Sequence, residues 1–295
     1  VLPSIPDTEG AKILLIQRKF FDDPEAVLGM IRSNGFLTVL DLDDIYLENE
    51  RIPFELYKKN LISFHALQTS TPFLADFLRQ IHPEVGIVGN HLARIRPLQP
   101  RPPAPTVRIV FAALNRHAGW GEIVDAYREI VLRHADRVTT VVVGDRDFPQ
   151  KLAPAKCIAK PTLAYPDYVA ELEKADIALL PLADNPFDRA KTDLKFIECA
   201  EAGAAVLASH IVYGDSVKPG KTGLVYRTVE EFKRHLEALI VENANRAKIA
   251  RQAHRYVSEQ RALATHVRHQ YAWYRSLIDR REALEQARRE RVGQA

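Results

Sequence analysis

One stretch of the chain restricts the fold more than any other. Residues 177–209 contain a short apolar run, a loop, a segment with helical spacing and a second apolar run. The first run predicts a strand buried on both faces at Ile177–Leu182. The helical spacing begins at Thr192 and ends at Gly203, just before a second strand at Ala205–Ala208. The stretch therefore predicts a βαβ unit of a parallel sheet, and ligands of such sheets bind beyond the carboxyl ends of the strands.

Three charged residues near the start of that helix form a candidate site. Lys191, Lys195 and Glu198 are spaced i, i+4 and i+7, so a helix places them on one face. Two ammonium groups and a helix N-terminus attract phosphate, and a carboxylate one turn further can accept both hydroxyls of a ribose. The alternative is a solvated face in which Lys195 attracts Glu198 at i, i+3, and spacing alone favours this alternative.

The same residues resemble a known motif. The segment DLKFIECAEAGAAVLAS is similar to the K-x-x-E-x-x-A-x-G-x-x-V-x-A stretch of GT-B glycosyltransferases, particularly the large retaining family 4, also called group 1. The resemblance implies that Glu198 binds the nucleotide ribose and that Lys195 is the lysine preceding it. The fuller family pattern has another glutamate eight residues earlier, where this chain has Ala190, so Asp188 or Asp193 would have to replace its contact to the donor sugar.

The first third of the chain alternates between strands and helices, which is typical of a second parallel sheet. The expected strands are 13–17, 36–42, 66–69 and 85–88, and the expected helices are 24–31 and 72–81.

Carboxylates cluster where the second of these strands ends. Asp41, Asp43 and Asp44 could bind a metal or orient an acceptor hydroxyl at this edge of the sheet, and an equally good interpretation is a turn and helix cap. In the resemblance, Asp43 and Asp44 look like an aspartate pair that one subgroup places in the cleft facing the donor. His65 is interpreted as structural.

A proline-rich connector, RPLQPRPPAPT at residues 96–106, separates two predicted domains because its prolines exclude a helix or a central strand. The predicted organisation is a shortened acceptor-side domain, a linker, a nucleotide-sugar-binding domain and a basic helix packing back across both domains. Their respective bounds are 1–98, 99–107, 108–262 and 263–295.

A loop near the start of the second domain is a candidate phosphate-binding loop. The sequence LNRHAGWGE, with Asn115, Arg116 and Gly119, combines glycine amides, a following helix and a cation. The glycine pattern alone is a weak signal. In the resembling family an arginine and a lysine of this loop bind the donor diphosphate. Ala118 stands at the lysine position, so Arg116 would supply the charge, together with His117.

The C-terminal segment is basic. Residues 262–291 predict one long helix whose far end is rich in arginine. The favoured interpretation is packing across both domains with a frayed end. The alternative is contact with an anionic membrane surface near a lipid-linked acceptor.

Composition narrows the class of protein. A chain of 295 residues with 46% hydrophobic and 27% charged residues can bury the core of two domains, and a net charge of +3 does not indicate a nucleic-acid partner. The two cysteines lack metal-type spacing and are expected to be reduced. With no membrane span or signal peptide apparent, the expected location is cytoplasmic, at most peripheral at the inner membrane face. The start at Val1 and a single methionine, Met30, suggest a piece of a longer chain.

These observations predict an α/β protein of the GT-B type, with two doubly wound, Rossmann-like parallel-sheet domains facing a cleft. The resemblance implies a hexosyltransferase-like enzyme that moves sugar from a UDP- or GDP-sugar to a hydroxyl of a glycan, lipid-linked or protein acceptor, with retention of configuration. Such activity fits glycan or cell-surface polysaccharide synthesis, and no metal or other cofactor is expected. Asp43, Asp44 and Lys195 are the predicted catalytic residues, with Asn115, Arg116, Gly119, Lys191, Lys195 and Glu198 on the donor. Two alternatives remain: a nucleotide-sugar epimerase of the same fold, and a non-catalytic module that binds nucleotide sugar or a protein.

Overall fold

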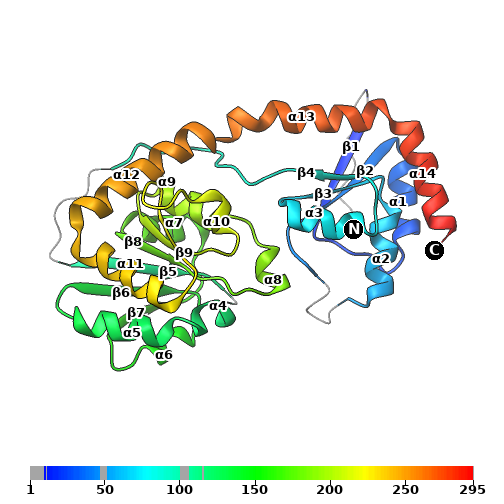
Figure 1. The fold of residues 1–295 in the computed structure, drawn as a ribbon. Coiled ribbons are helices and arrows are strands. Elements are labelled where there is room, and N and C mark those ends of the chain that lie inside the picture. The colour runs from blue at the N-terminus through cyan, green and yellow to red at the C-terminus, as the bar shows by residue number, and fades with distance from the viewer. Residues whose placement is uncertain (1–9, 11, 47–51, 100–105, 115, 295) are drawn as a thin grey trace. The chain divides into compact units, whose positions relative to one another are not determined.

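The computed structural model describes residues 10, 12–46, 52–99, 106–114 and 116–294 (Figure 1). The chain divides into two compact units. Unit 1 comprises residues 1–90, 190–192 and 267–295, and unit 2 comprises residues 91–189 and 193–266. Most of the expected linker 99–107 lies outside the described residues. Both units are parallel-sheet α/β structures, which confirms the predicted fold class. The double winding predicted for both sheets is present in unit 2, whereas the described strands of unit 1 follow one another without a reversal.

The sheet of unit 1 has four parallel strands in the order β1-β2-β3-β4. Its strands are β1 (Lys12–Gln17), β2 (Phe36–Leu42), β3 (Ala66–Thr69) and β4 (Val85–Ile87). They are joined by α1 (Pro24–Ser33), α2 (Phe54–Ser63) and α3 (Pro72–Arg79). Because each strand is added on the same side and parallel crossovers are right-handed, these helices all cover one face of the sheet. Leu40 and Leu67 pack there against Leu28, Leu61 and Leu74.

The opposite face of this sheet is covered by helices from the C-terminal end of the chain. They are α13 (Leu263–Asp279) and α14 (Arg281–Gly293), coloured orange to red in Figure 1. Alternation along β2 directs Leu37 and Val39 to this face, where they pack with Leu277 and Leu284. The strand order supplies no crossover helix here, so the C-terminal helices bury an otherwise exposed apolar surface.

Two expectations for the C-terminal segment are wrong. The single helix at 262–291 is two helices separated at Arg280, whose guanidinium donates to both carboxylate oxygens of Glu84 at 2.7 and 2.9 Å. The frayed arginine tail is an ordered helix within the described residues, because Arg288 is 5% exposed and pairs with Glu25 and Glu285.

The sheet of unit 2 has six parallel strands in the order β10-β9-β8-β5-β6-β7. Its strands are β5 (Val107–Ala112), β6 (Val138–Val143), β7 (Cys157–Lys160), β8 (Ile177–Leu180), β9 (Ala205–Ser209) and β10 (Leu224–Tyr226). The order reverses between β5 and β8, so the sheet is doubly wound and has a topological switch point there.

Helices cover both faces of the second sheet. They are α4 (His117–Gly121), α5 (Val124–Arg133), α6 (Phe148–Lys151), α7 (Tyr165–Glu173), α8 (Pro186–Arg189), α9 (Leu194–Glu201), α10 (Tyr213–Ser216), α11 (Val229–Val241) and α12 (Asn243–Gln260). One core lies under α7, α9 and α12, and the other lies under α5 and α11. None of the helices in the described part of the chain is both long and apolar enough to span a bilayer.

Candidate functional site

The switch point of unit 2 brings two loops into close contact. One follows β5 and leads into α4, and the other follows β8. Gly119 of α4 lies so close to the second loop that a Cβ atom would be 2.9 Å from the backbone of Pro181 and Leu182. Real Cβ atoms do not approach backbone that closely, so a glycine is required. Gly119, which the sequence assigned to a phosphate-binding loop, thus allows the loops after β5 and β8 to pack closely at the switch point.

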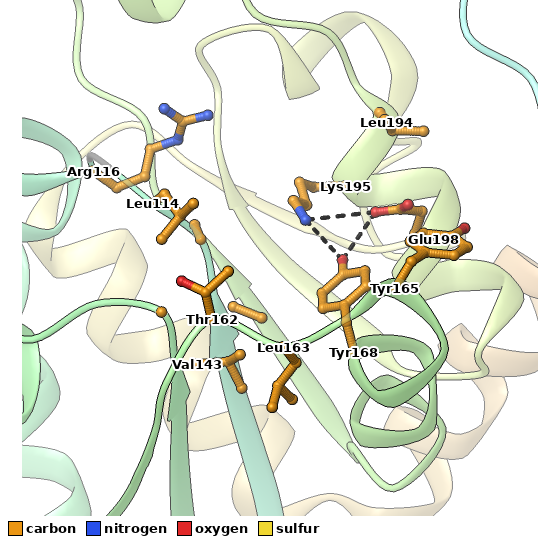
Figure 2. A pocket seen from close by; sticks show the side chains of 13 residues that line it. Leu114, Arg116, Val143, Thr162, Leu163, Tyr165, Tyr168, Leu194, Lys195 and Glu198 are labelled. Atoms are coloured by element: carbon orange, nitrogen blue, oxygen red, sulfur yellow. Dashed lines mark hydrogen bonds and ion pairs between the residues drawn. The ribbon is translucent and has the colours of Figure 1, made fainter.

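A pocket of about 390 Å³ opens beside these loops. Strand ends β5 and β6 form one wall, and α7 and α9 form another (Figure 2). It is lined by Ala112, Ala113, Leu114, Arg116, Val143, Gly144, Thr162, Leu163, Tyr165, Tyr168, Leu194, Lys195 and Glu198. Much of the lining is apolar, and its charged groups are Arg116, Lys195 and Glu198. A mainly apolar cavity with a few convergent polar groups is typical of a small-molecule site.

Three side chains from two helices interact at one end of the pocket. Tyr168 of α7 donates its hydroxyl proton to Glu198 Oε2 at 2.9 Å, and Lys195 Nζ donates to the same hydroxyl at 3.0 Å. Lys195 Nζ also lies 3.6 Å from Glu198 Oε2 and 4.1 Å from the centre of the Tyr168 ring. Figure 2 shows this arrangement, with dashed lines joining all three groups.

The two side chains that share this hydrogen bond, Glu198 and Tyr168, are both buried. Glu198 is 7% exposed and Tyr168 is 8% exposed. Burial, followed by the electrostatic effects of the Cys199 thiol and the Glu198 carboxylate, raises the pKa of the Tyr168 hydroxyl, so this hydroxyl remains a proton donor. The buried carboxylate therefore has a neutral donor and a cation beside it, as a buried charge requires.

Arg116 is the other cation of the pocket. Its Nη1 lies 3.6 Å from Oδ1 of Asp188, a carboxylate that is 2% exposed and accepts the backbone N–H of Ala183 at 2.9 Å. Arg116 is thus oriented by a buried carboxylate at the edge of the pocket. Asn115 lies outside the described residues, and His117 pairs at 3.3 Å with Asp147.

Lys191 does not share a helical face with Lys195 and Glu198, so that expectation is wrong. Helix α9 begins at Leu194, and Lys191 precedes it in a segment that belongs to unit 1. Asp193 immediately before the helix is held by Arg261 at 2.5 and 2.8 Å. Lys191 Nζ instead pairs with Asp44 Oδ2 at 2.5 Å. Neighbouring Ala190 is fully buried in the core of unit 1.

The aspartates after β2 have partners within unit 1. Asp43 pairs with Arg18 and accepts the Tyr46 hydroxyl at 3.1 Å, while Asp44 pairs with Lys191. These contacts fit the turn-forming interpretation and also fix the orientation of both carboxylates. His65 is buried, and its Nδ1 accepts the backbone N–H of Thr38, as expected for a structural histidine. Among the described residues no group of three or more His, Cys, Asp or Glu side chains could hold a metal ion.

A strained turn follows β9. Val212 has φ of 65° and ψ of −49°, and the N–H of Tyr213 donates to the carbonyl of Ile211 at 2.7 Å. This is a classic-type γ-turn, which is costly for a β-branched residue. The turn brings Tyr213 near Arg116, whose charge moderates the rise in the tyrosine pKa that burial causes. Residues with strained backbone of this kind are enriched at functional sites.

Sequence reasoning missed Tyr168 because it lies 27 positions before Lys195 on another helix. A local spacing pattern cannot join residues so far apart. The only signal was two tyrosines three positions apart, at 165 and 168, on a helix that leads toward the central stretch.

These features define a class of protein: a doubly wound parallel sheet with an apolar pocket, a carboxylate and two cations at its switch point. The comparison with family models agrees, since residues 125–273, just over half of the chain, match the model described as glycosyl transferase-like. The chain belongs to this family. No curated protein matches the sequence.

Solved structures resemble most of the chain. A glycosyltransferase from Rickettsia africae has a TM-score of 0.67 at 15% identity, with 90% of this chain and 77% of that chain covered. HepE of Anabaena, solved in complex with UDP-glucose, has a TM-score of 0.62 at 16% identity, with 89% and 78% covered. TarM of S. aureus, solved with UDP and a GlcNAc-glycerol, has a TM-score of 0.62 at 11% identity, with 89% and 55% covered. The present chain therefore spans about half the length of TarM, and these likenesses establish a shared GT-B glycosyltransferase fold.

Proposed function

We propose that the chain is a glycosyltransferase that binds a nucleoside-diphosphate sugar in the unit 2 pocket and transfers the sugar to a hydroxyl acceptor. The observation that carries the proposal is the position of Glu198 and Lys195 in a pocket at the switch point, with Arg116 on the same pocket. Family membership supports the reaction class. The UDP-glucose complex of the similar HepE structure supports a nucleotide sugar as donor.

The charges of the pocket suggest a division of roles. Glu198 would accept ribose hydroxyls, since a carboxylate can accept two hydroxyl donors. Arg116 would approach the diphosphate, with Asp188 fixing its direction. Lys195 would contribute further positive charge as the leaving group gains negative charge, because preorganised cations stabilise such a transition state. The protein would thus supply the charge stabilisation without a metal ion, with retention of configuration at the sugar.

Unit 1 would present the acceptor. Asp43 and Asp44 follow β2 at the carboxyl end of its sheet, and their ion pairs hold them in place. We propose that they orient the acceptor hydroxyl of a glycan, lipid-linked or protein substrate.

One observation favours a second candidate, a module that binds nucleotide sugar without transferring it. Ala190 stands at the position of the family's first glutamate, is fully buried and belongs to the unit 1 core, so it offers no carboxylate to a donor sugar. Asp188 is engaged by Arg116 and Asp193 by Arg261, which makes either a poor substitute.

The test is calorimetric titration of UDP, GDP and their sugar conjugates into the wild type and the Glu198→Ala variant. One nucleotide should bind, and the substitution should weaken it by roughly ten- to a hundredfold, because a charged hydrogen-bond acceptor is lost. Asp44→Asn should leave that affinity unchanged but reduce transfer from labelled donor. Tight binding without transfer to any acceptor would favour the binding module. A folded wild type that binds none of the nucleotides would contradict the donor site.

A further inference from the structure

Tyr168 makes contacts that the proposed donor-binding role does not by itself require. Its hydroxyl lies between Lys195 and Glu198, accepting from the ammonium at 3.0 Å and donating to Glu198 Oε2 at 2.9 Å. Its ring lies under the same ammonium. Three interactions thus converge on the Tyr168 side chain, in the pocket that also contains Glu198, the residue proposed to bind ribose (Figure 2).

These contacts treat the two oxygens of Glu198 differently. The Tyr168 hydroxyl and the Lys195 ammonium both approach Oε2, and Oε1 takes no part in these contacts. A glutamate on an otherwise unrestrained χ3 bond would interchange its two oxygens. The Tyr168 hydroxyl restricts that freedom, because only one orientation of the carboxylate keeps its hydrogen bond at 2.9 Å. The hydroxyl of Tyr165, whose pKa is raised by burial and then by Glu198, also faces this carboxylate.

We propose that Tyr168 is a positioning residue for ribose recognition. It holds Oε2 of Glu198 on the protein and leaves Oε1 as the oxygen that accepts a hydroxyl of the nucleotide ribose. The inference rests on the proposed donor site and adds a residue to it. Tyr168 also holds the Lys195 ammonium over its ring, which prevents the lysine from forming a closer pair with Glu198 that would compete with the ligand.

The packing of the two helices supports this role. Lys195 and Glu198 are at i, i+3 on α9, where a lysine could by itself approach the carboxylate more closely than the observed 3.6 Å. Tyr168 arrives from α7, and its hydroxyl, whose pKa is raised by burial, stays protonated and can donate. A phenylalanine at this position would keep the ring under Lys195 but lose the donor to Oε2.

The experiment compares how strongly the pocket distinguishes a ribose from a deoxyribose. The preferred nucleoside diphosphate, UDP or GDP, and its 2′-deoxy and 3′-deoxy forms are titrated into the wild type, Tyr168→Phe and Tyr127→Phe. Tyr127 is the matched control, because it is a fully buried tyrosine of the same unit that shares a 2.8 Å hydrogen bond with Thr140 in the core. Since each discrimination ratio is measured on one variant, any loss of folded protein cancels.

In the wild type at least one deoxy form should bind about tenfold more weakly than the ribonucleotide, the effect of leaving a buried acceptor unpaired. Tyr168→Phe should reduce this ratio to within about threefold of unity by weakening mainly the ribonucleotide. Tyr127→Phe should retain the wild-type ratio. A full ratio in Tyr168→Phe, or equal weakening of all three ligands, would overturn the positioning role. A wild type that binds UDP or GDP without discrimination would remove the ribose role of Glu198 as well, whereas no binding at all would contradict the proposed function itself.

Discussion

The two sheets of this protein differ in strand order and in what lies at the carboxyl ends of their strands. In unit 2 the strand order reverses between β5 and β8, and a pocket with Glu198, Lys195 and Arg116 lies at that point. In unit 1 the described strands follow one another in a single direction. Its edge carries Asp43 and Asp44, each in an ion pair. Both edges carry charge, but the reversal of strand order is what separates two crossovers enough to leave a crevice.

The two units also use their remaining surfaces differently. Both faces of the second sheet are covered by helices of unit 2 itself, whereas the first sheet needs α13 and α14 for its second face. Gly86 of β4 shows how close this covering is, since a Cβ atom there would lie 2.3 Å from the Trp273 ring. The stability of unit 1 therefore depends on helices far away in the sequence, and its buried histidines predict a sensitivity to acid.

The largest predicted difference between the units is their response to acid. His65 and His82 lie in unit 1, and burial lowers the pKa of each to about 4. Each Nδ1 accepts a backbone N–H, from Thr38 at 2.9 Å and from Glu84 at 3.1 Å, so protonation would break both hydrogen bonds. Because these pKa values lie below the unfolded value of about 6.5, stability is lost as pH falls from about 6.5 towards 4. At pH 5 the loss should be about 2 kcal/mol for each histidine.

The two tryptophans make this measurable. Trp273 lies in unit 1 and Trp120 in unit 2, so the Trp120→Phe and Trp273→Phe variants each report one unit by fluorescence during urea unfolding. The unit 1 midpoint should fall markedly from pH 7 to pH 5, and His65→Asn, whose amide oxygen can still accept from Thr38, should remove about half of that shift. Unit 2 should move less, because the partly buried His91 is the one histidine in its described part whose pKa is lowered to about 4, against two in unit 1. Equal shifts in both units would contradict the prediction.

A smaller effect is expected at the switch point of unit 2. Gly119→Ala places a methyl group against the Pro181 and Leu182 backbone and should destabilise unit 2 by about 1–3 kcal/mol. It should also weaken nucleotide binding, because the loop carrying Arg116 must shift. Gly121→Ala is the matched control, since a Cβ atom at this other glycine of α4 would meet nothing within 4 Å.

Unfolding in urea, followed through Trp120, distinguishes the two glycine variants. The Gly121→Ala variant should stay within about 0.5 kcal/mol of the wild type. If Gly119→Ala proved equally harmless and bound nucleotide normally, the contact between the β5 and β8 loops would not be what shapes the pocket.

Much of the fold could be predicted from sequence because its signals are local. Buried strands of a parallel sheet are continuous apolar runs, and the run at 177–180 with Gly203 placed β8, α9 and β9 almost as observed. Helices α2 and α12 were missed, and in α12 the apolar positions are sparse. In α12 the buried face comprises two alanines and Arg246 beside its only large apolar members, Ile249 and Val257.

The sequence predicted correctly only those contacts of the site that lie within a single helix. Lys195 and Glu198 share α9, so their spacing was enough to bring them into one pocket. Lys191 was assigned to the same helical face, but α9 begins only at Leu194, after Asp193, which pairs with Arg261. Lys191 therefore precedes the helix and belongs to unit 1. The position of Tyr168, the pairing of Arg116 with the buried Asp188 and the covering of the first sheet by α13 and α14 all depend on contacts between distant segments, which local spacing does not encode.

The smallest effect is predicted for the basic C-terminal helix. Arg280 is paired with Glu84, Arg288 with Glu25 and Glu285, and Arg289 with Glu285, so these arginines already have carboxylate partners within unit 1. A free basic side chain near an anionic surface contributes about 1 kcal/mol, and paired ones contribute less. Wild-type protein should therefore co-sediment equally with phosphatidylcholine vesicles and with vesicles that also contain phosphatidylserine. Glu285→Gln, which releases Arg289 and loosens Arg288, should raise recovery with the anionic vesicles. Strong binding of the wild type to the anionic vesicles alone would instead show that the helix contacts a membrane, and unit 1 would then differ from unit 2 in having a lipid-binding surface.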